Sequence, residues 1–154
     1  MANVHLIIDF IDTLAIPPYL DLVSPRLLVD ETPEGAPMYQ NFLGLAHVPV
    51  GLIDGPEVEI SIINESGQER FASPTILVPT LGSWFGDLRF VVSGMDDFLR
   101  RPGERRGYGT VNVREKTGRR IGLATMIKVV NLVDGSMLVD HMNDRAFARP
   151  AMKE

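Results

Sequence analysis

Five aspartates have the residue type for chemistry, either as catalytic carboxylates or as ligands of a hard cation. Aspartyl-phosphate chemistry needs a nucleophilic carboxylate and a second carboxylate that handles the proton, both on one face of a strand. Asp9 and Asp12 are three residues apart in an apolar run, so on a strand they point to opposite faces, which argues against catalysis. Calcium binding stays open, because calcium gathers carboxylates from loops; its candidate ligands are Asp9, Asp12, Asp54, Asp96 and Asp97.

A dense run of cations is the second group that could bind something. Eight Lys/Arg residues lie between positions 100 and 120, with only Glu104 and Glu115 as acids among them. Clustered cations can bind phosphates, but Tyr108 is the one aromatic residue in the run, which gives poor support for a platform that stacks single-stranded bases. Nucleic-acid binding is therefore an alternative expectation. The run contributes these candidate partner contacts: Arg100, Arg101, Arg105, Arg106, Arg119 and Arg120.

Three aromatic residues complete the candidate contacts. Trp84 and Phe85 are adjacent, and such a pair can anchor a protein partner or plug one end of a core. Tyr19 lies in a proline-rich stretch whose apolar residues are expected to pack against the chain's own domain or against a neighbouring molecule. The three histidines of the chain are scattered, and there is no cysteine, so we expect no metal site and no cofactor.

The charges are sorted along the chain. Residues 1–69 contain eleven Asp/Glu and a single base, Arg26, whereas residues 70–154 contain fourteen Lys/Arg and nine Asp/Glu. Surfaces of opposite sign attract each other, either within one molecule or between copies. The net charge of −5 opposes diffuse binding of nucleic acid by the whole surface.

The totals favour one domain over residues 1–154, with enough chain for a sizeable core. The absence of cysteine fits a reducing compartment. Asp9 interrupts the N-terminal apolar run, and no basic region precedes it, so a signal peptide is poorly supported. No apolar run is long enough to span a bilayer. We therefore expect a cytoplasmic or virion location and no membrane partner.

Alternating apolar residues predict most of the strands. Val58, Ile60 and Ile62 share one face of a strand, and 64–67 is a hairpin-type loop whose partner strand covers 70–78. Further strands are predicted over 42–53, broken near Pro49, and over 88–92. Residues 110–114, a turn at 115–118 and a return strand over 121–129 predict a long β-hairpin.

The two ends of the chain are predicted differently. Five of the eleven prolines fall between residues 17 and 37, which predicts an extended arm or long loop over 16–41, with a short edge strand at Arg26–Asp30. Residues 132–154 are predicted as a C-terminal tail, with a short helix over Met137–Ala148 that stops at Pro150.

The stretch from Glu57 to Asn131 resembles small immunoglobulin-like or C2-like β-sandwich domains of bacterial and phage proteins. The resemblance is carried by the two strands around Asn64-Glu-Ser-Gly67 and by Pro102-Gly103 ahead of the predicted closing hairpin. It implies an all-β, antiparallel β-sandwich and no chemistry.

These observations favour a non-enzymatic structural or adaptor module that docks on copies of itself or on another protein. A phage virion component, such as a decoration, capsid-associated or tail protein, is one such module. The alternatives are a C2-like domain that binds calcium or another ligand, and a nucleic-acid-binding β protein that uses Arg100–Arg120.

Overall fold

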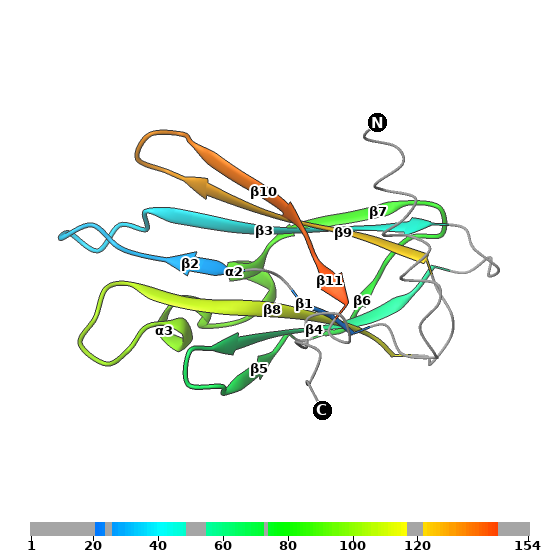
Figure 1. The fold of residues 1–154 in the computed structure, drawn as a ribbon, viewed down its shortest axis with the longest axis horizontal. Coiled ribbons are helices and arrows are strands. Elements are labelled where there is room, and N and C mark those ends of the chain that lie inside the picture. The colour runs from blue at the N-terminus through cyan, green and yellow to red at the C-terminus, as the bar shows by residue number, and fades with distance from the viewer. Residues whose placement is uncertain (1–20, 24–25, 49–54, 73, 117–121, 145–154) are drawn as a thin grey trace, which may run out of the picture.

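A computed structural model describes residues 21–23, 26–48, 55–72, 74–116 and 122–144. These residues form two antiparallel β-sheets that lie one above the other in Figure 1. The prediction of an all-β, antiparallel fold is therefore confirmed. In the part of the chain that is described, no helix has the length and apolar character needed to cross a membrane.

The first sheet has seven strands and is built around β8 (Gly107–Glu115). One edge of β8 pairs with β4 (Glu57–Asn64), which pairs on its far side with β5 (Glu69–Phe71) and β6 (Ile76–Leu77). The other edge of β8 pairs with two short strands in succession, β1 (Asp21–Val23) and β2 (Leu27–Val29). The two-residue strand β11 (Asn143–Asp144) pairs with β1.

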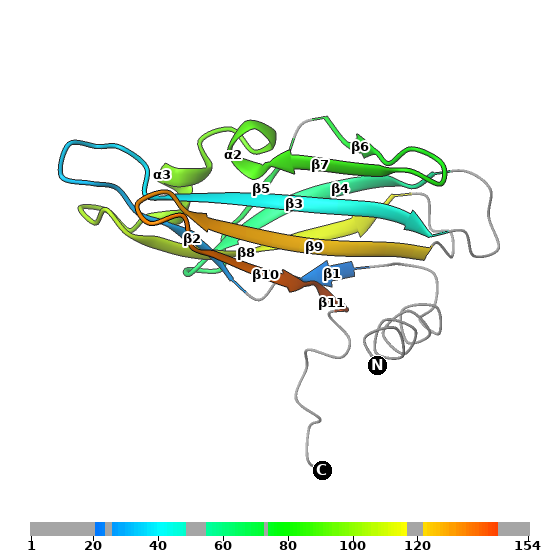
Figure 2. The ribbon, with the colours of Figure 1, turned by 90° about the horizontal axis from the view of Figure 1, so that it is seen from above.

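The second sheet has four strands in the order β10, β9, β3, β7. Two short helices connect it to the first sheet at one end of the molecule (Figure 2). The elements are β3 (Tyr39–Val48), β7 (Ser83–Asp87), α2 (Leu88–Val91), α3 (Met95–Leu99), β9 (Gly122–Asn131) and β10 (Met137–His141).

The core lies between the two sheets and is made by alternate residues of their strands. Burying a side chain such as Leu, Ile or Val completely contributes roughly 1.5–3 kcal/mol. The predicted face of β4 is confirmed, and the other central strands contribute in the same way; the fully covered residues include Val58, Ile60, Ile62, Leu43, Val111 and Val113.

The predicted hairpin between 110–114 and 121–129 is wrong. Both segments are strands, but β8 belongs to the first sheet and β9 to the second, so they do not pair with each other. Both edges of β8 are taken, by β4 on one side and by β1 and β2 on the other. The chain therefore crosses between sheets after β8, and β9 pairs with β3 and β10 instead.

Two other predicted elements also differ from the structure. The segment predicted as a strand over 88–92 forms α2: the Asp87 carboxylate accepts a hydrogen bond from the Arg89 backbone N–H, and Leu88 and Val92, four residues apart, are both buried. The predicted C-terminal helix is wrong over its described part, because Met137–His141 pairs with β9 as β10. Gly135, at φ 75°, lets the chain reverse between the two strands.

Within the predicted arm, β1 and β2 lie antiparallel to β8, so these residues rest on their own sheet. The register along β8 shifts by one residue between the two strands. The sequence places Pro25 between them, and a proline has no N–H to give to a ladder. Of the candidate residues, Tyr19 lies outside the described residues, as do Arg119 and Arg120.

Two glycines of β8 allow α3 to sit directly on the sheet. A Cβ added to Gly107 would lie 2.2 Å from the carbonyl oxygen of Leu99, and one added to Gly109 would lie 2.4 Å from Leu99 Cδ2. Gly107 and Gly109 therefore serve the packing of α3 on β8. This packing positions the end of α3, and with it Arg100, beside the first sheet.

Gly107→Ala is expected to lower the free energy of unfolding by about 3 kcal/mol, because the new methyl group overlaps backbone atoms that cannot move independently. The control is Gly35→Ala, at φ 84° with no heavy atom within 4 Å of the new Cβ, where only backbone strain of about 1 kcal/mol is expected. Urea unfolding of both variants measures the difference. A Gly107→Ala protein as stable as Gly35→Ala would contradict the close packing of α3 on β8.

Candidate functional site: a charged network and an apolar hairpin

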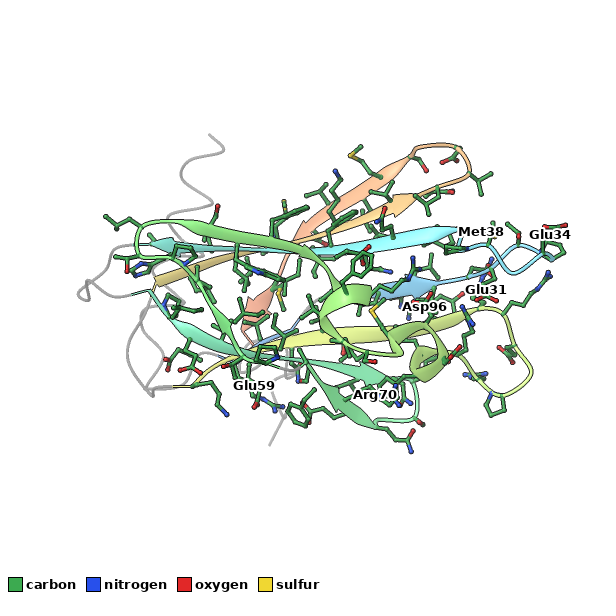
Figure 3. The ribbon with its side chains drawn as sticks, turned by 180° about the vertical axis from the view of Figure 1, so that it is seen from behind. Glu31, Glu34, Met38, Glu59, Arg70 and Asp96 are labelled. Carbon is green, nitrogen blue, oxygen red and sulfur yellow. The ribbon has the colours of Figure 1, made fainter. Side chains whose placement is uncertain are left out.

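Of the candidate arginines that the structure describes, Arg100 is the most enclosed, with a side chain that is 14% exposed. It follows α3 and forms an ion pair with Glu31, in the segment after β2; it also pairs with Asp96 at 3.7 Å and Asp97 at 3.2 Å. Figure 3 shows Glu31 and Asp96 at the same end of the molecule. The three carboxylates neutralise the charge of this largely buried guanidinium.

Two neighbouring arginines pair in the same manner. Arg106 Nη2 lies 2.9 Å from Asp30 Oδ2, and Arg101 Nε lies 2.9 Å from Glu65 Oε2. The hydrogen bond to Asp30 is the main reason why the pKa of Arg106 is raised, so this guanidinium stays charged. Arg105, the remaining candidate in this loop, is exposed.

The cations further along β8 also pair with carboxylates from the first part of the chain. Arg114 Nη2 lies 2.9 Å from Glu69 Oε1, and Lys116 Nζ lies 3.0 Å from Glu59 Oε2. All five paired cations from Arg100 to Lys116 therefore bind at least one carboxylate from residues 1–69. Among the described residues, the opposite charges of the two parts of the chain meet within one molecule. A phosphate backbone would have to displace these carboxylates.

The described calcium candidates are also engaged by arginines. Asp96 Oδ2 lies 2.8 Å from Arg89 Nη2 and also faces Arg100, so two guanidinium groups already neutralise it. Asp97 is exposed and pairs with Arg100. In the described ranges, no three His, Asp or Glu side chains are grouped to hold a metal ion. The other candidates, at positions 9, 12 and 54, lie outside those ranges.

Trp84 and Phe85 point to opposite faces of β7, as neighbours on a strand must. Trp84 is half-buried and packs against the core. Phe85 is 53% exposed and stacks on the ring of Phe42, with ring centres 5.2 Å apart. Of this pair, only Phe85 offers a large aromatic surface to a partner.

The outer face of the second sheet has a shallow apolar hollow. It measures about 270 Å³ and lies over Gly44, whose missing side chain leaves space between Phe85 and Met126. A Cβ at Gly44 would come within 3.2 Å of Met126 and 3.3 Å of Phe85. A small apolar side chain of a partner could enter here.

The β9–β10 hairpin carries the largest run of exposed apolar side chains among the described residues. It lies at the border of the second sheet, with its connecting loop at the end of the molecule (Figure 1). We use the name hairpin surface for these five residues, which are 47–66% exposed: Leu132, Val133, Met137, Leu138 and Val139.

The tip of the hairpin is held by its own side chains. Asn131 Oδ1 accepts a hydrogen bond from the Val133 N–H at 2.9 Å. Asp134 Oδ1 accepts hydrogen bonds from the Ser136 hydroxyl at 2.6 Å and from the Ser136 N–H at 2.8 Å. These bonds hold the pKa of Asp134 below its ordinary value, with the Ser136 hydroxyl as the largest cause. The apolar residues are thus presented by an ordered turn.

The sequence prediction missed the hairpin surface, because residues 137–148 were predicted as a helix and no partner contact was expected in this tail. One signal was present: Asp134-Gly135 is typical of a hairpin turn, and Met137-Leu-Val follows it directly. The pairing with β9 then exposes residues that a helix would have half-buried.

Comparisons with known proteins add no relative. No family model matches the chain, no curated protein matches it, and no solved structure matches it.

Arg100→Met is expected to lower the free energy of unfolding by about 2 kcal/mol, because it leaves Glu31 without its partly buried counter-charge and takes one of two guanidinium groups from Asp96. Arg101→Met is the matched control: its pair with Glu65 is solvent-exposed, and the expected loss is below about 1 kcal/mol. Urea unfolding at moderate salt measures both. Equal losses in the two variants would contradict the structural role of Arg100.

Ser136→Ala is expected to raise the pKa of Asp134 toward its ordinary value, because the carboxylate loses its strongest hydrogen bond. Since the folded-state pKa of Asp134 is lowered, its stabilising contribution is present above the unfolded-state pKa and is lost as the pH falls through the folded-state value. An NMR titration of the Asp134 carboxyl measures the change. Ser66→Ala, in a different hairpin, should leave the titration unchanged; an unshifted pKa in Ser136→Ala would refute the assignment.

Proposed function

We propose that this protein is a non-enzymatic structural or adaptor module that docks on protein through the hairpin surface. The observation that carries the proposal is the set of five large apolar side chains exposed together on one ordered hairpin. Monomeric soluble proteins rarely expose contiguous apolar patches of this kind unless a partner covers them.

The pairing of charges supports an apolar rather than an electrostatic docking. The cations of the β8 segment and the carboxylates that precede them bind each other within one chain. Opposite-sign patches are therefore poor candidates for holding copies together. Apolar burial, which salt does not screen, supplies the attraction in this proposal.

The finer identity of the fold belongs to the same proposal. An immunoglobulin-like or C2-like sandwich is supported by the two antiparallel sheets and by the β4–β5 hairpin, whose Gly67 adopts φ 81°. A virion component, for example a decoration, capsid-associated or tail protein, would use such a sandwich as a building block with one apolar docking hairpin. Calcium binding and nucleic-acid binding receive less support, because Asp96 and Arg100 neutralise each other.

A photo-crosslinking amino acid at position 138 tests the docking function. It should give covalent adducts with protein, either with the purified chain itself or in an extract of cells that produce it. The control carries the same amino acid at position 104, where Glu104 is exposed in the arginine-rich loop. Gel electrophoresis and mass spectrometry measure the adducts. A yield at position 138 no higher than at position 104, in both settings, would overturn the proposal.

A further inference from the structure

Resting on the proposed function, we infer that the docking partner is a second copy of this chain. The inferred contact pairs β10 of one copy antiparallel with β10 of the other, about a two-fold axis through Val139. Three features of β10 support this contact: an edge with which no other described strand pairs, a row of exposed apolar side chains, and a register in which it can pair with its own copy.

One edge of β10 has unused backbone groups. The pairing with β9 includes a hydrogen bond from the Asn131 N–H to the Ser136 carbonyl oxygen, at 2.8 Å. In an antiparallel ladder such pairs alternate, so Leu138 and Asp140 also face β9. Met137 and Val139 therefore direct their N–H and C=O groups to the other edge, where no described residue pairs with them.

At the C-terminal end of β10, the N–H on this same edge already has a hydrogen-bond partner. The His141 N–H, which points the same way as those of Met137 and Val139, donates to its neighbour's carboxylate, Asp140 Oδ1, at 2.8 Å. The unused groups are thus confined to the apolar part of β10. A partner strand would meet its hydrogen-bonding edge and its exposed side chains together.

Among the edge strands of the described residues, β10 exposes the most large apolar side chains; β7, the other edge of its sheet, also has five residues but of these side chains exposes only Phe85. Natural sheets discourage edge-to-edge pairing with charged side chains, short strands or bulges. In the first sheet, β5 contains Glu69 and Arg70 and is three residues long, and β11 has two residues. By contrast, β10 has five residues and begins with three exposed apolar ones. Its length and its exposed apolar side chains are features that favour pairing with another strand.

The residues of β10 favour pairing with themselves in one register. The axis at Val139 places Val139 opposite its own copy, Met137 opposite His141 and Leu138 opposite Asp140. The two Val139 residues can then exchange hydrogen bonds, and each Met137 N–H can donate to the His141 carbonyl oxygen of the other copy. Shifting the axis to Asp140 would place two carboxylates opposite each other, which is unfavourable. The chosen register also joins the outward-facing Met137 and Val139 of both copies into one apolar stripe. The contact is isologous, so it closes at a dimer.

Val139→Cys tests this contact directly, since the chain has no cysteine of its own. Opposed residues of a hydrogen-bonded antiparallel pair have Cα atoms roughly 5.5 Å apart, within the range of a disulfide. Under mild oxidation we expect disulfide-linked dimer to form about tenfold faster than in Phe90→Cys, because pairing raises the effective thiol concentration. Phe90 is the matched control: it is 87% exposed and lies on α2.

Leu138→Cys checks the register, because the two Leu138 residues do not face each other about this axis. A dimer from Leu138→Cys that forms faster than from Val139→Cys would overturn the register. Val139→Cys that reacts no faster than Phe90→Cys would overturn the inference. If it does so while position 138 crosslinks to a different protein, the docking function stands and only the second copy is excluded.

Val139→Pro supplies a readout without a thiol. The substitution removes an N–H that β9 does not use, so the hairpin should keep its fold, as checked by circular dichroism, while the copies can no longer pair. Sedimentation should show a dimer for the original chain and a monomer for the variant. A folded variant that still sediments as a dimer, or an original chain that is monomeric at high concentration, would overturn the inference.

Discussion

Both edges of β8 are occupied, and most of the architecture follows from this constraint. β4 takes one edge, and the consecutive strands β1 and β2 take the other. A strand with no free edge cannot form a hairpin with the segment that follows it. The chain must therefore leave the first sheet after β8, and β9 builds the centre of the second sheet together with β3. The hairpin that β9 then forms leaves β10 at the edge of the second sheet, where no other described strand pairs with it.

The same arrangement accounts for the charges. Because β2 lies along β8, the residues that follow β2 arrive beside the arginines that flank β8, which brings Asp30 to Arg106 and Glu31 to Arg100. Gly107 lets the end of α3 approach the sheet closely enough for Arg100 to complete this cluster. Within the described residues, five cations of the basic part thus pair with carboxylates of the acidic part on one molecule. Among the described residues, the largest group of exposed apolar side chains lies on the β9–β10 hairpin.

Local patterns predicted some parts of this structure and not others. The alternation of Val58, Ile60 and Ile62 identified a strand face that is indeed buried, and 64–67 forms the expected turn. The apolar residues 88–92 alternate too, but Leu88 and Val92 satisfy a helical spacing equally well, and the cap from Asp87 decides for the helix. The arginines of 100–106 were recognised as a group, whereas their partners, far away in the sequence, were not assigned. The hairpin surface was missed because Met137–His141 shows no periodicity that excludes a helix.

The sequence by itself determined that this chain folds into antiparallel strands, which of their faces are buried, and that its two parts carry opposite charge. These properties depend on side-chain alternation, turn residues and composition, which are local. Only the tertiary structure decided which strands pair, that Arg100 and Arg106 pair with the carboxylates after β2 in the same molecule, and that β10 lies at the edge of the described second sheet. Strand pairing joins residues far apart in the sequence, and the pattern of Val111 and Val113 is the same whether the next strand lies beside β8 or in the facing sheet. The choice is made by competition for the edges of β8, which no segment reveals alone.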